Sequence, residues 1–184
     1  MKITYPHTIE NCLGEKIIFK RLVPEPDGDR LLVENYVTPG NGPIMHTHLL
    51  QDESLTVING RIGYQIKGGE EQFAGEGDTV TFKRGVPHRF WNAGNDILHC
   101  KGYIKPANTI VFFLSSIYAA QNKTGTERPE AFDGAYLMTK YRSEYEMNDM
   151  PLFVRKVIIP LTYLIGRLRG KYSHFKDAPA PAKA

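Results

Sequence analysis

The sequence predicts an all-β chain with a helical extension at its C-terminal end, and two observations carry this prediction. From residue 16 to residue 105, short apolar or alternating runs are separated by turn sequences such as EPDGD, TPGNGP and AGEGD. Many short strands at this spacing are typical of a β-sandwich or β-barrel. After Pro106 the apolar residues recur at helical spacing, as in TIVFFLSSIYAAQN.

Six runs are the expected strands. Alternation or β-favouring composition supports the extended chain in each, and glycine-containing turns separate them. The runs are Lys16–Val23, Arg30–Thr38, Glu53–Ile58, Arg61–Ile66, Asp78–Phe82 and Ile97–Ile104. The dipeptide Asn59-Gly60 lies between two of them and predicts a two-residue hairpin.

The chain is expected to divide into three parts. Residues 1–108 form the β-domain, residues 109–176 form the helical extension, and residues 177–184 form a tail. The tail reads DAPAPAKA, a proline- and alanine-rich composition that predicts disorder.

Three helical segments are expected in the extension. Thr109–Asn122 has apolar residues at helical spacing, and Ala135–Glu146 is expected to hold a further helical turn. A third helix begins near Pro151, because proline is tolerated in a first helical turn. Pro160 lies inside this third segment and predicts a kink.

Charge argues against a nucleic-acid partner. The formal net charge is only +3, too small to indicate a basic binding face across the whole chain. The excess is concentrated in residues 151–176, which contain six basic residues and no acid. They are Arg155, Lys156, Arg167, Arg169, Lys171 and Lys176.

The sequence favours a cytoplasmic location. Cys12 and Cys100 form no metal-binding or redox pair by spacing, so reduced thiols are expected. The N-terminal residues MKITYPHTIENCLGEK lack the apolar core of a signal peptide. No uncharged apolar run approaches the length of roughly 20 residues that a spanning helix needs.

A histidine pair suggests a metal centre. His46 and His48 are separated by one residue on a predicted strand, so both imidazoles point to the same face. Glu53 follows at the start of the next strand, and His88 lies forty residues after His48. Gln51 and Asp52 are alternative ligands beside Glu53, but alternation favours Glu53 as the inward residue.

Two longer patterns contain these residues, and they resemble the two conserved motifs of the cupin superfamily. The patterns are Gly40-(x5)-His46-x-His48-(x4)-Glu53-(x6)-Gly60 and Gly77-(x5)-Lys83-x-Gly85-(x2)-His88-(x3)-Asn92. Lys83 departs from the family, which usually has proline at that position. The resemblance covers roughly residues 16–105.

The resemblance implies a double-stranded β-helix, or jelly-roll, barrel that holds one divalent metal ion. The implied ligands are His46, His48, Glu53 and His88, and the implied assembly is a homodimer. Nitrogen and oxygen donors of this kind suit iron, manganese, nickel, copper or zinc. Glu53 is also the candidate catalytic base, if it leaves the metal.

Alternation predicts a mostly apolar barrel interior, which favours a small, partly apolar organic ligand over a phosphosugar. Other inward positions on this prediction are Ile44, Val57, Ile66 and Val80. The residues expected to contact the ligand are Tyr36, Leu55, Tyr64, Phe82 and Phe90.

Two classes of function fit these features. One is a metal-dependent dioxygenase-like enzyme acting on a small aromatic molecule. The other is a binding or sensing module without turnover, and an isomerase or decarboxylase is a third candidate. A fold with so many functions does not decide among them.

The extension carries a basic amphipathic segment. We expect its apolar stripe to pack on the barrel exterior or on a second subunit, and peripheral contact of residues 151–176 with an anionic membrane is the alternative. The stripe consists of Leu152, Phe153, Val157, Ile158, Leu161, Leu164, Ile165 and Leu168.

Overall fold

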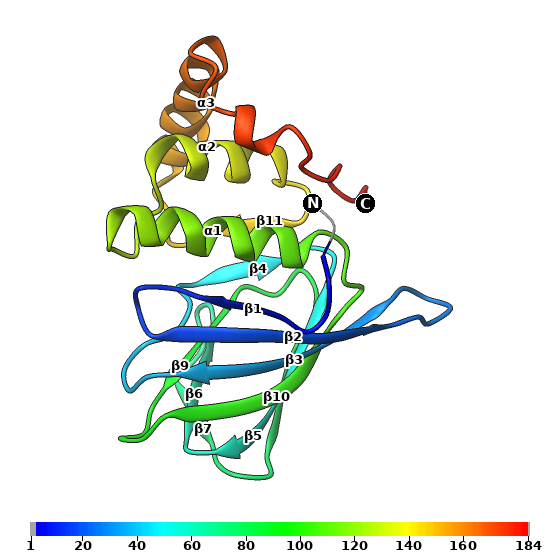
Figure 1. Cartoon of the computed structure of the whole chain (residues 1–184). Coiled ribbons are helices and arrows are strands. Elements are labelled where there is room, and N and C mark those ends of the chain that lie inside the picture. The colour runs from blue at the N-terminus through cyan, green and yellow to red at the C-terminus, as the bar shows by residue number, and fades with distance from the viewer. Residues whose placement is uncertain (1–2, 184) are drawn as a thin grey trace.

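A computed structural model of the chain describes residues 3–183 and shows two antiparallel sheets facing each other, with helices stacked at one end (Figure 1). The first sheet has the order β1-β2-β3-β10-β5-β8. Its strands are β1 His7–Glu10, β2 Glu15–Val23, β3 Arg30–Val37, β10 Leu98–Lys105, β5 Asp52–Asn59 and β8 Thr79–Phe82. This β-barrel with a helical extension is the fold class that the sequence predicts.

The second sheet has the order β11-β4-β9-β6-β7. Its strands are β11 Tyr145–Met147, β4 His46–His48, β9 His88–Asn92, β6 Ile62–Ile66 and β7 Gln72–Ala74. The six expected strands are all present, and β1, β7 and β11 are additions that the sequence did not reveal.

The hairpin predicted at Asn59-Gly60 is wrong. Gly60 has φ 92°, the left-handed geometry that a tight turn needs. However, β5 belongs to the six-stranded sheet and β6 to the five-stranded sheet. The turn therefore passes the chain from one sheet to the other instead of joining two paired strands.

The helices form successive layers above the barrel (Figure 1). α1 Ile110–Thr124 lies against the barrel, α2 Ala131–Lys140 packs on α1, and α3 Ile159–Leu168 packs on α2. The backbone adopts π-helical spacing over Val154–Ile158, immediately before Pro160. This change in spacing accommodates the proline, which has no N–H to donate. No helix among the described residues is long and apolar enough to cross a membrane.

The helical extension also contributes a strand to the barrel. The segment Ala135–Glu146 was expected to hold a further helical turn, but its last two residues belong to β11. This strand pairs with β4, with Tyr145 opposite His48 and Met147 opposite His46. Strand β4 is only three residues long and pairs with β9 through the single position His46–His88. β11 therefore supplies most of the backbone pairing of β4.

The tail also differs from the disorder that its composition predicts. Residues 177–183 have no regular secondary structure, but they lie along the end of α2 and the turn after it, which donate hydrogen bonds to them. The Tyr141 hydroxyl donates to the Pro179 carbonyl at 2.8 Å, and the Ala182 amide donates to the Glu144 carboxylate at 2.8 Å. These contacts give the proline-rich segment a fixed path.

Two apolar cores meet inside the molecule. One lies within the barrel and includes Val37, Leu55, Val57, Ile62, Phe82, Phe90 and Leu98. The other lies between the barrel and the helices and includes Phe19, Leu31, Ile104, Ile110, Phe113, Leu137 and Tyr145. Glu53 pairs with Phe82 on one side and with Ile104 on the other, so it lies where the two cores meet.

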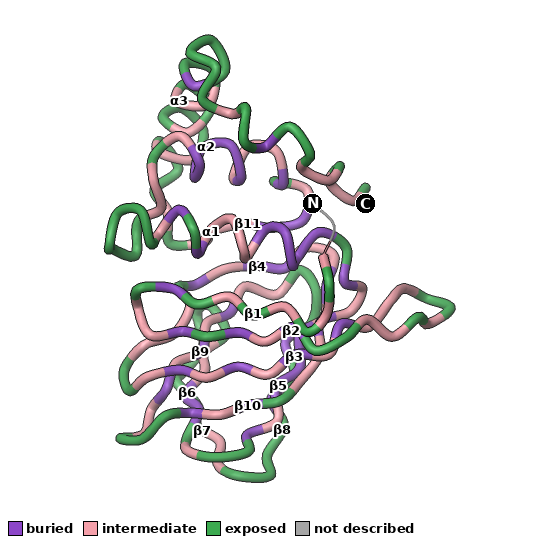
Figure 2. Tube along the Cα trace, in the orientation of Figure 1, coloured by how far each residue is buried: buried purple, intermediate pink, exposed green. Residues whose placement is uncertain are grey.

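The apolar stripe of the third helical segment does not pack on the barrel, because α1 and α2 lie between α3 and the sheets (Figures 1 and 2). Leu161 is 51% exposed and Leu168 is 80% exposed. Tyr163 and Gly166 occupy the opposite side of α3, against Tyr136 and Phe132 of α2. The expectation that the stripe packs on the barrel exterior is wrong.

We predict that Gly102→Ala destabilises the barrel. A Cβ at Gly102 in β10 would lie 1.8 Å from the carbonyl oxygen of Ser54 in β5, so two paired strands would have to separate. The expected loss is about 1–3 kcal/mol in the free energy of unfolding, measured by chemical denaturation. Gly75→Ala is the matched control, because no atom lies within 4 Å of its added Cβ. Equal stability of the two variants would contradict the prediction.

Candidate metal centre

Two neighbouring strands present the three histidines. In β4, His46 and His48 are two residues apart and share a face. His88 begins β9 and is paired directly with His46, so its side chain points to the same side of the sheet. His48 and His88 are buried, and His46 is partly exposed.

The fourth group comes from the opposite sheet. Glu53 in β5 is buried at 7% exposure and points into the barrel, as predicted. Asp52 points the other way and accepts hydrogen bonds from the backbone and side chain of Arg84. Gln51 is fully buried, but its amide contacts Glu144 at 2.9 Å and does not join the histidines. Alternation therefore selected the carboxylate that faces the three histidines.

The four side chains converge on one point. One ligand atom from each of His46, His48, Glu53 and His88 lies within 4.8 Å of the other three. The Nε2 atoms of His46 and His48 are 3.2 Å apart, and His88 Nε2 is 3.2 Å from Glu53 Oε2. His48 Nε2 is 3.6 Å from the same carboxylate oxygen.

Backbone carbonyls fix the orientation of two of the rings. His46 Nδ1 donates to the Ile44 carbonyl at 2.7 Å, and His88 Nδ1 donates to the Val86 carbonyl at 2.9 Å. A carbonyl can only accept, so Nδ1 carries the proton and the Nε2 of a neutral ring presents a lone pair. This arrangement is the one that metal-binding histidines commonly adopt.

The electrostatic environment keeps His46, His48 and Glu53 deprotonated near neutral pH. Burial lowers the pKa of His46 to about 3, with a further contribution from His48 and His88. Burial also lowers the pKa of His48 to about 4, although the charge of Glu53 partly opposes it. Burial raises the pKa of Glu53, but its contacts with His88, His48 and His46 outweigh this effect and bring the pKa to about 2.

These donors fit a divalent ion. Lone pairs of neutral imidazoles and an ionised carboxylate face one another at 3.2–3.6 Å, an arrangement that is unfavourable unless a cation or proton lies between them. Three imidazoles and one carboxylate leave a net charge of about +1 on a divalent ion and leave coordination positions free for a ligand.

Four of the five predicted ligand-contacting residues lie in the barrel core, on the side of the metal cluster. Leu55, Phe82 and Phe90 are buried, and Tyr64 is partly buried against them. The ring of Phe82 stacks on His88 with centroids 4.0 Å apart and planes 4° apart. Phe82 is thus in direct contact with a candidate ligand of the metal.

Tyr36 was placed wrongly inside the barrel. In β3 the buried residues alternate, and both neighbours of Tyr36, Asn35 and Val37, are buried. Tyr36 therefore points to the outer face. There its ring stacks on His99 at 4.3 Å and its hydroxyl donates to Glu34 at 3.1 Å. Two other residues expected inside are exposed: Ile44 at 51%, in the irregular segment before β4, and Ile66 at 36%, at the end of β6.

Sequence reasoning missed a buried polar network beside the ligands. Thr109 donates to Glu144 at 2.7 Å, and the Gln51 amide donates both to Glu144 and to the Tyr145 hydroxyl at 3.1 Å. The ring of Tyr145 meets that of His48 edge-on, with centroids 5.7 Å apart. These residues are scattered over the chain, so no local motif indicated that they meet.

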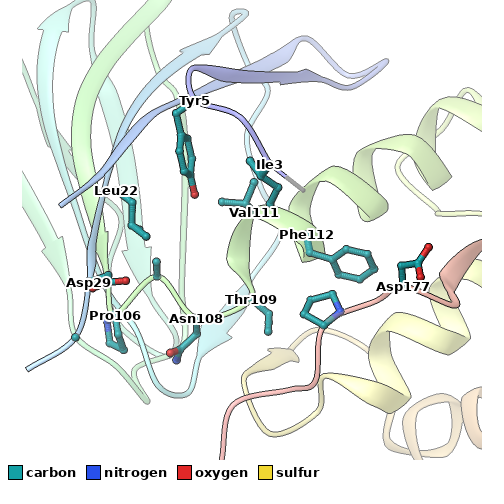
Figure 3. Close-up of a pocket in the computed structure, with 13 residues that line it drawn as sticks. Ile3, Tyr5, Leu22, Asp29, Pro106, Asn108, Thr109, Val111, Phe112 and Asp177 are labelled. Atoms are coloured by element: carbon teal, nitrogen blue, oxygen red, sulfur yellow. The ribbon is translucent and has the colours of Figure 1, made fainter. Parts of the chain in front are cut away.

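A cavity of about 510 Å³ lies elsewhere (Figure 3). It is bounded by the N-terminal segment, the start of α1 and the C-terminal tail, and Tyr5, Asp29, Phe112 and Asp177 are among its lining residues. Burial and the nearby charge of Asp29 raise the pKa of Tyr5. No residue of the metal cluster lines this cavity, so it is separate from the candidate centre.

Comparison with known families agrees with the geometry. Residues 35–101 match the model of the family described as "Cupin domain". The chain contains a cupin domain. The matched residues include all four members of the His/His/Glu/His cluster. The resemblance noted in the two sequence motifs is therefore confirmed, and the cupin domain is the part of the chain that holds the cluster.

Similar proteins come from fungi and bacteria. "Probable oxidoreductase patJ" of Penicillium expansum is 30% identical over 88 residues, which are 48% of this chain and 23% of that protein. The chain thus matches less than a quarter of the length of that relative.

The solved structures to which the chain is similar include a conserved Klebsiella pneumoniae protein with a double-stranded beta-helix domain. It is 21% identical, with a TM-score of 0.42, over 59% of this chain and 80% of that one. KdgF from Halomonas sp. is 16% identical, with a TM-score of 0.46, over 57% and 92% of the two chains.

We predict that the protein binds one divalent ion per chain and that His46→Ala and His88→Ala abolish this binding without unfolding the barrel. Each change removes a donor from the cluster, so affinity falls by more than the roughly 10–100-fold that loss of an outer-shell partner costs. Elemental analysis after metal loading measures the ion, and circular dichroism measures the fold. His99→Ala is the matched control, since His99 stacks on Tyr36 at the outer face. Undiminished binding in both cluster variants would refute the assignment.

We predict that the metal-free protein loses stability as pH falls from about 7 to about 5. The folded pKa values of His46 and His48 lie below the ordinary 6.5, so the unfolded chain takes up protons first and becomes favoured. In this window the buried His48 contributes up to about 1.4 kcal/mol per pH unit to the loss of stability, and the partly exposed His46 contributes less. Below about pH 4.5 stability falls further, because the pKa of Glu53 is about 2 in the folded chain and the unfolded chain therefore takes up a proton at this carboxylate first.

Chemical denaturation in the presence of a chelator, repeated along the pH series, measures this effect. His48→Gln should flatten the dependence, because glutamine does not titrate. A wild-type curve that is already flat above pH 5 would contradict the prediction.

Proposed function

We propose that the protein is a mononuclear-metal enzyme of the dioxygenase-like type that acts on a small, partly apolar organic molecule. The observation that carries the proposal is the convergence of three imidazole nitrogens and one carboxylate oxygen within 4.8 Å beside an apolar barrel core. Such a site has both a place for an ion and an apolar surface for a substrate.

The residues of the chain have distinct tasks in this proposal. His46, His48, Glu53 and His88 would hold the ion, which when bound supplies Lewis acidity and, if it is redox-active, electron transfer. Phe82 fixes the ring plane of His88, and Phe82 together with Tyr64 offers an aromatic surface to a flat substrate. Burial of three of the four donors keeps bulk water away from the reacting groups.

Glu53 is better suited to binding the ion than to removing a proton. A general base works best when its pKa lies near the working pH. The pKa of Glu53 is lowered to about 2, so its carboxylate is a weak proton acceptor. We therefore propose that Glu53 acts mainly as a ligand, and that the catalytic-base role foreseen for it is secondary.

The access route is proposed to pass His46. His46 is the one partly exposed member of the cluster, and Ile66, paired in register with His88, is exposed nearby. A substrate entering here would meet the ion before it meets Phe82. The name "Probable oxidoreductase patJ" of the fungal relative is compatible with redox chemistry, although only 23% of that protein is matched.

We predict that the metal-loaded protein consumes oxygen in the presence of a suitable small aromatic or enol-bearing compound. Iron-, manganese-, nickel- and copper-loaded samples are compared in an oxygen electrode across a panel of such compounds. His88→Ala should abolish uptake because it removes an ion ligand, and His99→Ala should retain it. Metal binding without uptake for every metal and compound would favour the non-catalytic binding or sensing module. Conversion without oxygen would favour an isomerase or decarboxylase.

A further inference from the structure

The segment from Leu152 to Leu168 has a continuous apolar face that the described residues of the chain leave largely exposed. Eight of its large apolar residues are between 37% and 80% exposed. Within α3, Leu161, Leu164, Ile165 and Leu168 recur at the three- and four-residue spacing of one helix face. A face of this size on a protein surface usually marks a binding site for another apolar surface.

The opposite side of the same segment is anchored. Gly166 is buried, and Tyr163 stacks on Tyr172 with centroids 5.3 Å apart. Arg155 forms an ion pair with Glu146 of β11. The helix is therefore held by its inner side, and its apolar residues are exposed. α3 lies at the end of the molecule farthest from β5 and β8 (Figures 1 and 2).

Cations accompany this apolar face. Residues 151–176 contain six basic residues and no acid. Arg167 and Arg169 are exposed on the last turn around Leu168, and Lys171 follows directly. Arg167 and Arg169 form no ion pair with any of the described residues, so their charge remains available to an outside anion.

We propose that this face docks on an anionic lipid surface, with the leucines and isoleucines in the headgroup and acyl boundary and the arginines at the phosphates. An apolar helix face flanked by unpaired cations has the composition that binds such surfaces. A second copy of the chain is less well matched, because symmetric apposition of this face would bring like charges together without an acid to neutralise them. The proposal does not depend on the chemistry of the metal centre.

The full chain is tested by sedimentation with vesicles of phosphatidylcholine alone or mixed with phosphatidylglycerol, at low and at high salt. We expect binding only to the mixed vesicles and release at high salt, because salt screens exposed charges. The triple variant Leu161→Ser, Leu164→Ser, Leu168→Ser should lose binding. The triple variant Arg167→Gln, Arg169→Gln, Lys171→Gln should bind on the order of a hundredfold more weakly, since each basic residue near the surface adds about fivefold.

The double variant Phe73→Ser, Ile97→Ser is the matched control, because it removes exposed apolar side chains from the barrel. Its vesicle binding should equal that of the unmodified chain. Absence of binding to mixed vesicles, or equal binding to neutral ones, would overturn the proposal. So would a dimer in size-exclusion chromatography that the serine variant converts to a monomer without any vesicle binding. The glutamine variant changes only side chains on or beside the exposed turn, so its result stands even if the serine variant fails to fold.

Discussion

Four electron-pair donors in a space smaller than 5 Å are the constraint on which the structure depends. The Nε2 atoms of His46 and His48 are 3.2 Å apart, and His88 Nε2 lies 3.2 Å from Glu53 Oε2. Three of the four side chains are buried, so bulk water does not solvate them. In the absence of a cation this arrangement costs free energy, because desolvated donors of the same polarity repel. The surrounding structure must therefore hold the side chains in place, as Ile44 and Val86 do through their carbonyls.

The position of the cluster follows from the two cores. Apolar residues of the barrel contact it on one side through Phe82, and residues of the helical core reach it on the other through Tyr145. A polar cluster between two packed cores is rigid, because neither core can relax without creating a cavity. Rigidity of the donors favours selective binding of an ion whose preferred geometry they match.

The cluster of candidate metal ligands could be predicted from the sequence because the determining pattern is local. Strand periodicity places His46 and His48 on one face regardless of the rest of the fold. Tyr36 could not be placed, since β3 has apolar residues on both faces: Leu31 and Val33 point inward, while Leu32 and Tyr36 do not. When both phases of a strand are apolar, only its neighbours decide which one is buried.

Pairing over long distances in the chain was equally hidden. β11 has three residues, too few for a periodic signal, and its partner β4 lies about a hundred residues earlier. At Gly60 the opposite happened. The sequence correctly predicted a tight turn, but it did not indicate that the two strands joined by this turn belong to different sheets. Helical periodicity likewise identified the apolar face around Leu161, but periodicity does not say what covers such a face.

The barrel and the extension are coupled closely enough that residues 1–108 are an incomplete unit. Without β11, the pairing of β4 would rest on the single position His46–His88. The Gln51 amide would lose both of its acceptors, Glu144 and Tyr145, and each buried polar group left unpaired costs about 1–3 kcal/mol. Gln51 precedes Glu53 by two residues, so the loss of these hydrogen bonds would act directly on the strand that carries the candidate carboxylate ligand. The extension is thus part of the framework of the candidate metal centre, whereas the exposed face of α3 can change without disturbing that framework.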